Sequence, residues 1–116
     1  MLASAMVFSL AACGGGGSSE GNPDATTFKI GGIGPTTGNN AIYGTAVQNG
    51  IQLAVDEINA DGGINGYQIE YQFEDDQSDS EKSVNAYNTL KDWGMQMLVG
   101  TVTSTPCVAV VEETHA

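Results

Sequence analysis

The distribution of apolar and polar residues along the chain predicts strands and helices in strict alternation. A short apolar run at residues 28–33 contains glycines and predicts the first strand, and glycine, proline and asparagine at 34–40 predict a loop after it. The next residues form an apolar stripe at i, i+4, i+7, i+8 and i+11: Val47, Ile51, Ala54, Val55 and Ile58. This spacing is typical of one buried helix face, and Gly62 and Gly63 predict the end of that helix.

The second strand and second helix are predicted from a change in the spacing of apolar residues, first to the alternating pattern of a strand and then back to the spacing of a helix. Residues 67–74 alternate apolar and polar without a break, which predicts a strand with one wet face at or near a sheet edge. Ser78 and Glu81 fit a capping box at the start of the next helix. This helix is expected to stop at Gly94. Four of its residues are expected to face the core: Val84, Tyr87, Leu90 and Trp93.

A third strand is predicted at 95–100, apolar enough at 97–99 to be interior. Pro106 favours the first position of a third helix, with Thr105 or Ser104 as the N-cap. The order is therefore β-α-β-α-β-α. Alternation with short links predicts an α/β fold, a parallel sheet with right-handed crossovers.

Charge and composition narrow the function classes. The chain carries 14 acidic and 3 basic residues, a net charge of -11. This argues against nucleic-acid binding and against electrostatic adhesion to anionic lipid. The acids at 75, 76, 79 and 81 lack the spacing of a calcium loop and are interpreted as a solvated turn and a helix start. Cys107 is expected to be a small buried hydrophobe, and no cofactor or metal is predicted.

The N-terminal segment ends in the run Leu10-Ala11-Ala12-Cys13, followed by glycines. This run resembles the lipobox of bacterial lipoproteins, which implies a signal peptide at 1–12 and a lipid on the Cys13 thiol. No Lys or Arg precedes Lys29, so the basic n-region is missing. Residues 13–27 are predicted to be a tether, and the protein to be exported and anchored to the outer face of the cytoplasmic membrane. The alternative is a tail with an accidental cysteine.

Ligands of open parallel sheets bind outside the carboxyl ends of the strands, which here means the loops at 34–43 and 101–105. The second loop leads into a helix N-terminus, where unpaired N–H groups favour an anion. Thr103, Ser104 and Thr105 add three hydroxyls there, so a small carboxylate or phosphate is the expected guest. The alternative is that these hydroxyls only cap the helix.

Nucleotide and catalytic motifs are not found. The glycines from Gly32 to Gly38 miss the dinucleotide spacing by one position, and Pro35 lacks the N–H that a pyrophosphate needs. A Walker A lysine is absent, and no nucleophile, base and orienting group come together. The sequence is therefore expected to be no enzyme.

Three segments in the same order resemble one family: 28–44 (FKIGGIGPTTGNNAIYG), 54–66 (AVDEINADGGING) and 98–106 (LVGTVTSTP). They are similar to type I periplasmic binding proteins, and more narrowly to the leucine/isoleucine/valine-binding components of branched-chain amino-acid ABC transporters. The resemblance implies that residues 28–116 form the first, truncated part of the N-terminal lobe of a two-lobed clamshell.

The resemblance also implies roles for single residues. Tyr43 matches the aromatic residue that leans over the ligand side chain, and Ser104 matches the hydroxyl residue that binds the ligand's α-carboxylate. Backbone amides from Thr105 onward add to that carboxylate site. The expected partners are an amino acid, the permease subunits and the membrane through the lipid. The alternative is an amino-acid-sensing module of a receptor with the same fold.

Overall fold

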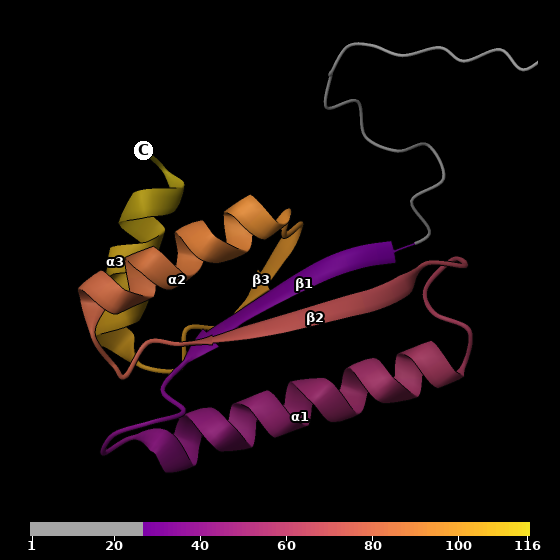
Figure 1. The fold of residues 1–116 in the computed structure, drawn as a ribbon, viewed down its shortest axis with the longest axis horizontal. Coiled ribbons are helices and arrows are strands. Elements are labelled where there is room, and N and C mark those ends of the chain that lie inside the picture. The colour runs from indigo at the N-terminus through magenta and orange to yellow at the C-terminus, as the bar shows by residue number, and fades with distance from the viewer. Residues whose placement is uncertain (1–26) are drawn as a thin grey trace, which may run out of the picture.

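Parallel strands and helices alternate through residues 27–116, the part of the chain that the computed structural model describes (Figure 1). The elements are β1 (Thr27–Gly34), α1 (Ala41–Ala60), β2 (Gln68–Asp75), α2 (Ser80–Trp93), β3 (Met97–Val99) and α3 (Ser104–Thr114). The predicted β-α-β-α-β-α order of an α/β fold is confirmed.

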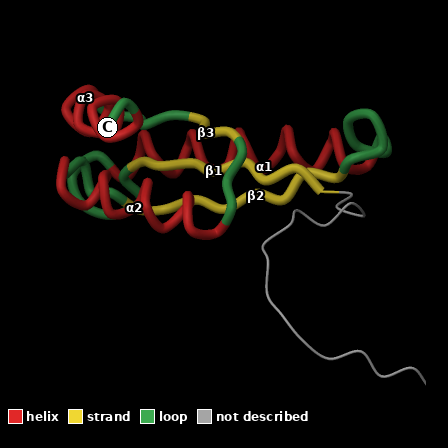
Figure 2. The backbone as a smooth tube through the Cα atoms, turned by 90° about the horizontal axis from the view of Figure 1, so that it is seen from above, coloured by secondary structure: helices red, strands yellow, loops and turns green. Residues whose placement is uncertain are grey.

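The described sheet has three strands in the order β2-β1-β3, and both pairings are parallel. Figure 2 shows β1 lying between the other two strands. β2 is at an edge, as its alternating sequence predicts. β3 pairs with β1 alone among the described residues and lies at the other edge, so the prediction that 97–99 is interior is wrong for this sheet. The interior strand is β1, which is buried continuously from Ile30 to Gly34.

Helices cover the sheet on both faces, with α1 on one face and α2 and α3 on the other (Figure 1). The core under α1 consists of Ile30, Val55 and Ile69. The core under α2 and α3 consists of Ile33, Ala86, Leu90 and Val110. Ile30 and Ile33 of β1 thus contribute to opposite faces, and both faces of the sheet are buried against helices.

Glycines in β1 make room for large neighbours on both faces. A Cβ added to Gly31 would lie 2.3 Å from the Met95 sulfur, and one added to Gly32 would lie 2.4 Å from the Phe73 ring. At these distances the neighbouring side chains would have to shift, so glycine lets the Met95 thioether and the Phe73 ring pack directly against the backbone of β1. The glycines that the sequence places in this strand are therefore packing positions.

The buried stripe of α1 differs in part from the predicted one. Val55 is buried, and Ile51 and Ile58 pack against the core as expected. Ala54 is exposed and Val47 is 36% exposed, while the buried residue of the first turns is Gly44. The sequence pattern missed Gly44 because glycine has no apolar side chain to count.

The starts of α2 and α3 correct two capping predictions. The N-cap of α2 is Asp79, whose side chain accepts a hydrogen bond from the Lys82 N–H. Ser78 has φ of 60°, in the left-handed region, whereas an N-cap residue needs extended backbone, so the predicted capping box does not form. α3 has Thr103 as its N-cap, which places Pro106 third in the helix instead of first.

The core face of α2 agrees with the predicted one at Tyr87, Leu90 and Trp93, of which Leu90 is buried and the other two pack against the core. Val84 is only half-buried, and the first turns of the helix bury Ser83 and Ala86 instead. Gly94 ends the helix with φ of 92°, as predicted. The predicted signal peptide at 1–12, the Cys13 lipidation and residues 13–26 of the tether lie outside the described residues. None of the described helices is both long enough and apolar enough to span a membrane.

Candidate functional site

The loops that follow the three strands meet at one end of the sheet. Figure 1 shows the N-terminal ends of α1, α2 and α3 together at this end. The loop 35–40 follows β1, 76–79 follows β2 and 100–103 follows β3. The parallel topology therefore brings both loops that the sequence singled out to the same edge, where parallel sheets bind ligands.

No side chain among residues 27–116 caps the N-terminus of α3, and the first two residues of this helix are exposed. Thr103 has extended backbone with φ of -111° and ψ of 150°, and its side chain makes no capping hydrogen bond. Ser104 and Thr105 are the first two helical residues and are exposed, so their N–H groups have no partner within the helix. The expectation that these hydroxyls only cap the helix is therefore wrong, and the N-terminus is available to an anion.

Two threonine hydroxyls beside this N-terminus are buried and unpaired. Among the described residues, the Oγ1 atoms of Thr101 and Thr103 find no hydrogen-bond partner. The two threonine residues belong to the lining of an open cavity of about 310 Å³, to which Ser104 and Val108 also belong. The sequence analysis named Thr103 and missed Thr101, because a threonine in a polar turn carries no signal of burial.

Tyr43 lies in the first turns of α1, with 63% of its surface exposed. Its N–H donates to the Asn40 carbonyl over 3.0 Å. The next residue, Gly44, is packed against the loop so closely that a Cβ would lie 1.7 Å from the Pro35 oxygen. The position of Tyr43 is therefore set by backbone contacts, while its ring remains free.

Asp75, at the end of β2, holds the loop after β1. Its carboxylate accepts hydrogen bonds from the Thr36 N–H (2.8 Å), the Thr37 N–H (3.4 Å), the Thr37 hydroxyl and the Gln77 N–H (3.0 Å). Desolvation by burial raises the pKa of the Asp75 carboxyl, but these hydrogen bonds outweigh it and leave the pKa below its ordinary value. Asp75 is therefore ionised when it binds the loop.

Asp76 is fully buried, which corrects the interpretation of this acidic run as a solvated turn. Its carboxylate accepts from the Ser78 N–H (2.8 Å) and the Ser83 hydroxyl (3.4 Å). Desolvation raises the pKa of the Asp76 carboxyl above its ordinary value, against the lowering effect of these hydrogen bonds. Asp79 and Glu81 do lie at a helix start, as predicted.

Cys107 is exposed, so the prediction of a small buried hydrophobe is wrong. It lines an open cavity together with Leu98 and Gly100, between α3 and the end of β3. Within residues 27–116, no three His, Cys, Asp or Glu side chains lie close enough together to hold a metal ion.

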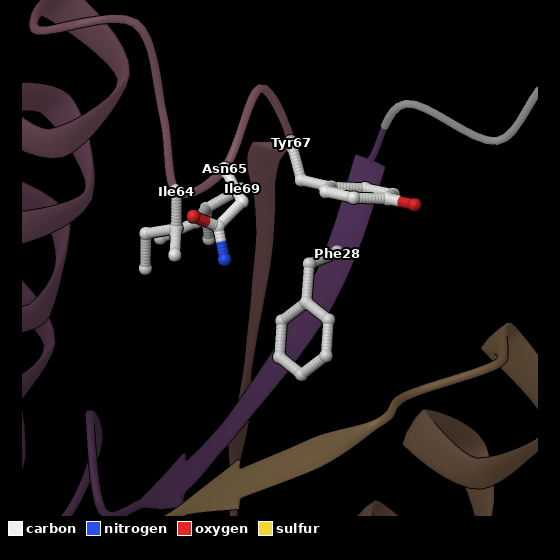
Figure 3. Close-up of a pocket in the computed structure, with 5 residues that line it drawn as sticks. All are labelled: Phe28, Ile64, Asn65, Tyr67 and Ile69. Atoms are coloured by element: carbon white, nitrogen blue, oxygen red, sulfur yellow. The ribbon is translucent and has the colours of Figure 1, made fainter.

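A second cavity lies at the opposite end of the strands (Figure 3). It has a volume of about 260 Å³ and is lined by Phe28, Ile64, Asn65, Tyr67 and Ile69. Phe28 and Ile69 belong to the first residues of β1 and β2, whereas the loops described above follow the last residues. This apolar cavity is therefore separate from the candidate site.

The fold and the strand-end loops place the chain in a family of binding proteins. The sequence profile described as "Periplasmic binding protein" matches residues 27–115. The chain belongs to this family, and its resemblance to the type I periplasmic binding proteins of branched-chain amino-acid transport is confirmed. The expectation of a binding protein instead of an enzyme is confirmed by the same match.

Two relatives within this family are binding proteins for branched-chain amino acids. The Leu/Ile/Val-binding protein BraC3 of Rhizobium johnstonii is 43% identical over 81 residues, which cover 70% of this chain and 22% of the relative. The leucine-, isoleucine-, valine-, threonine- and alanine-binding protein of Pseudomonas aeruginosa is 39% identical over 80 residues, which cover 69% of this chain and 21% of the relative.

A solved structure shows the same arrangement. The branched-chain amino acid transporter substrate binding protein LivJ of Streptococcus pneumoniae, in complex with isoleucine, superposes with a TM-score of 0.72 at 41% identity. The match covers 77% of this chain and 26% of LivJ. The chain thus spans about a fifth of the length of the curated relatives it matches and about a quarter of this structure.

Proposed function

We propose that this chain belongs to a substrate-binding lipoprotein of an ABC transporter, which captures an amino acid and delivers it to a membrane permease. The observation that carries the proposal is the uncapped N-terminus of α3, where exposed Ser104 and Thr105 follow two buried unpaired threonine hydroxyls. The solved relative at 41% identity holds isoleucine, which supports a branched-chain or related amino acid as the ligand.

In this proposal, the N-terminus of α3 binds the ligand's α-carboxylate. The Ser104 hydroxyl donates to one carboxylate oxygen, and the N–H groups of Ser104 and Thr105 donate along the helix axis. The Thr103 hydroxyl, which is buried and unpaired without a ligand, adds a further donor when its side chain rotates toward the carboxylate. Hydrogen bonds to a carboxylate are stronger than those to neutral acceptors, so these contacts contribute strongly to the binding of the ligand.

Charge favours an amino acid over phosphate as the guest. The chain carries a net charge of -11, and its three basic residues are Lys29, Lys82 and Lys91, all outside the loop 100–103 and α3. A phosphate is a net anion, so the negative charge of the chain would repel it, and no basic side chain in the loop 100–103 would compensate for this repulsion. A zwitterionic amino acid has no net charge, and helix N–H groups suffice for its carboxylate.

Tyr43 covers the ligand's side chain in this proposal. Its ring is exposed, while its backbone is held by Asn40 and by the contact between Pro35 and Gly44. Because the backbone is held, only the two side-chain torsions of the ring are restricted on binding, so burying an apolar side chain against the ring is favourable. Tyr43 thus discriminates between amino acids by the apolar area of their side chains, and other residues bind the charged groups of the ligand.

Export and lipid attachment complete the proposal, and they rest on the run Leu10-Ala11-Ala12-Cys13. A fatty-acid probe added to producing cells is expected to label the protein and to leave the Cys13→Ser variant unlabelled. Equal labelling of both proteins would contradict lipidation at Cys13 without affecting the ligand site.

Calorimetric titration of the natural protein with leucine, valine and glycine tests the ligand site. Loss of a charge-assisted hydrogen bond costs roughly 1.5–3 kcal/mol, so Ser104→Ala is expected to weaken all three by about 10- to 150-fold. Tyr43→Ala is expected to weaken leucine and valine and to spare glycine. Thr114→Ala, which removes a hydroxyl from the far end of α3, is the matched control. Unchanged binding in Ser104→Ala would contradict the carboxylate assignment.

A further inference from the structure

The loop after β2 holds the loop after β1 in place through side chains that have no role in the proposed ligand contacts. Asp75 is the main tie, with its carboxylate bound to both Thr36 and Thr37. The Gln77 N–H binds the same carboxylate and fixes its orientation. Four donors thus converge on one side chain, and two of the three donor residues belong to the loop 35–40.

Two further contacts join the same loops. The Asn40 amide nitrogen donates to the Ser78 hydroxyl over 2.9 Å, at the point where α1 begins. The Asp76 N–H donates to the Gly34 carbonyl over 3.2 Å, at the end of β1. The loop 35–40 is therefore bound to the loop after β2 at its beginning, in its middle and at its end.

These contacts reach Tyr43 through the backbone. Pro35 is fully buried and presses its carbonyl against Gly44, the residue after Tyr43. The Tyr43 N–H is bonded to the Asn40 carbonyl, and Asn40 is itself held by Ser78. A shift of the loop would therefore move the first turn of α1, and the Tyr43 ring with it.

We propose that Asp75 is the positioning residue for Tyr43: its carboxylate fixes the loop 35–40, and the loop fixes the first turn of α1. The inference rests on the proposed function in one respect, the contact between Tyr43 and the ligand side chain. Asp75 itself touches no ligand in this account. Its effect is on selectivity between side chains, because the carboxylate end of the ligand is bound by α3 on another loop.

Amide hydrogen exchange in the isotope-labelled chain tests the positioning without any ligand. Asp75→Ala is expected to speed exchange at Thr36 and Thr37 by about 10-fold or more, because their hydrogen bonds to a charged acceptor are lost. Exchange at Tyr43 is expected to speed up as well, because the first turn of α1 is no longer held by the loop 35–40. Exchange in β1 should stay unchanged. Glu74→Gln is the matched control, because the neighbouring Glu74 carboxylate bonds only to Gln72 among the described residues. Faster exchange at Thr36 and Thr37 with an unchanged Tyr43 would overturn the proposal.

Ligand affinity separates a positioning role of Asp75 from a purely structural one, because only a positioning role would change the selectivity between amino acids. Asp75→Ala is expected to weaken isoleucine binding and to leave glycine binding unchanged, because glycine offers no side chain to Tyr43. An equal loss for both amino acids would show that Asp75 only stabilises the fold. If the unaltered protein binds neither amino acid, the proposed function fails, while the exchange at Tyr43 still decides the positioning role.

A second variant covers the case in which Asp75→Ala does not fold. Asp75→Asn keeps one acceptor oxygen and replaces the other by an amide nitrogen, so it retains part of the contact with the loop. Its exchange rates at Thr36, Thr37 and Tyr43 are expected to be higher than those of the unaltered chain, because the charge of the acceptor is lost. Rates equal to those of the unaltered chain would contradict the role of the carboxylate.

Discussion

At the scale of single residues, two glycines of α1 show how strongly the surroundings decide the effect of one methyl group. A Cβ on Gly44 would lie 1.7 Å from the Pro35 oxygen, whereas a Cβ on Gly50 would meet nothing within 4 Å. We expect Gly44→Ala to lower the free energy of unfolding by about 1–3 kcal/mol, as overpacking does. Gly50→Ala should raise it by about 0.5–1 kcal/mol, because alanine favours a helix.

Urea unfolding of the two variants and the unaltered chain checks this pair of predictions. The two substitutions are chemically identical, and both lie in the same helix, so helix propensity cancels between them. Equal changes in the two variants would contradict the close packing of Gly44 against the loop after β1.

Asp76 gives a residue-scale prediction about pH. Because its folded-state pKa is raised by desolvation, its contribution to stability is present below the unfolded pKa of about 4 and is lost as the pH rises through the folded pKa. Asp76→Asn keeps an acceptor for the Ser78 N–H and removes the charge. We expect this variant to have a higher Tm than the unaltered chain at neutral pH, with the difference shrinking in acid.

Thermal unfolding between acidic and neutral pH measures this effect. Glu70→Gln, which removes an exposed carboxylate from β2, serves as the control and should change the Tm little at either pH. A Tm of Asp76→Asn that lies below that of the unaltered chain at neutral pH would show that the buried charge is stabilising.

At the scale of elements, the edge of β2 is protected by a side chain from α1. The Asn59 amide nitrogen donates to the Ile69 carbonyl over 2.8 Å, and the Asn59 oxygen accepts from the Ile69 N–H over 2.7 Å. Asn59 thus pairs with β2 as a neighbouring strand would. The Asn59 side chain thereby satisfies the backbone N–H and carbonyl of Ile69 at a partly buried part of the strand edge.

Removing this contact is expected to destabilise the chain. Asn59→Ala leaves two backbone groups of Ile69 without their partners, so we expect a loss of about 1–3 kcal/mol in the free energy of unfolding. Gln52→Ala is the control, because within the described part of the chain the Gln52 side chain bonds only to the exposed Asp56 side chain on the same helix. Urea unfolding of both variants measures the difference, and equal stabilities would contradict the bridging role of Asn59.

Element order and type were predictable from the sequence, because apolar periodicity and the positions of glycine and proline are local signals. The end of α2 at Gly94 was predictable because glycine readily adopts the positive φ that closes a helix. The start of α2 was not, since Ser78 and Asp79 are both good N-caps and only their backbone angles decide between them. The burial of Gly44 was equally hidden, because it depends on the path of a loop.

At the scale of the whole molecule, the described chain separates two regions at opposite ends of its strands. The carboxyl ends carry the polar loops with Tyr43 and Ser104, and the amino ends carry the apolar cavity around Phe28 and Tyr67 (Figure 3). The polar end was predictable, because parallel topology fixes where the loops gather. The unpaired hydroxyl of Thr101 and the burial of Asp76 were not, because they depend on how α3 and α2 pack over the strand ends.

The most direct test of the central claim, that the N-terminus of α3 binds an amino acid's carboxylate, is a titration of the isotope-labelled chain followed by its backbone amide signals. Isoleucine is added in one series and isoleucinamide, which lacks the carboxylate, in the other. We predict that the amide signals of Ser104 and Thr105 move with isoleucine and saturate, and that isoleucinamide binds at least about 10-fold more weakly. Equal responses to the two compounds, or no movement of these two signals with isoleucine, would contradict the claim.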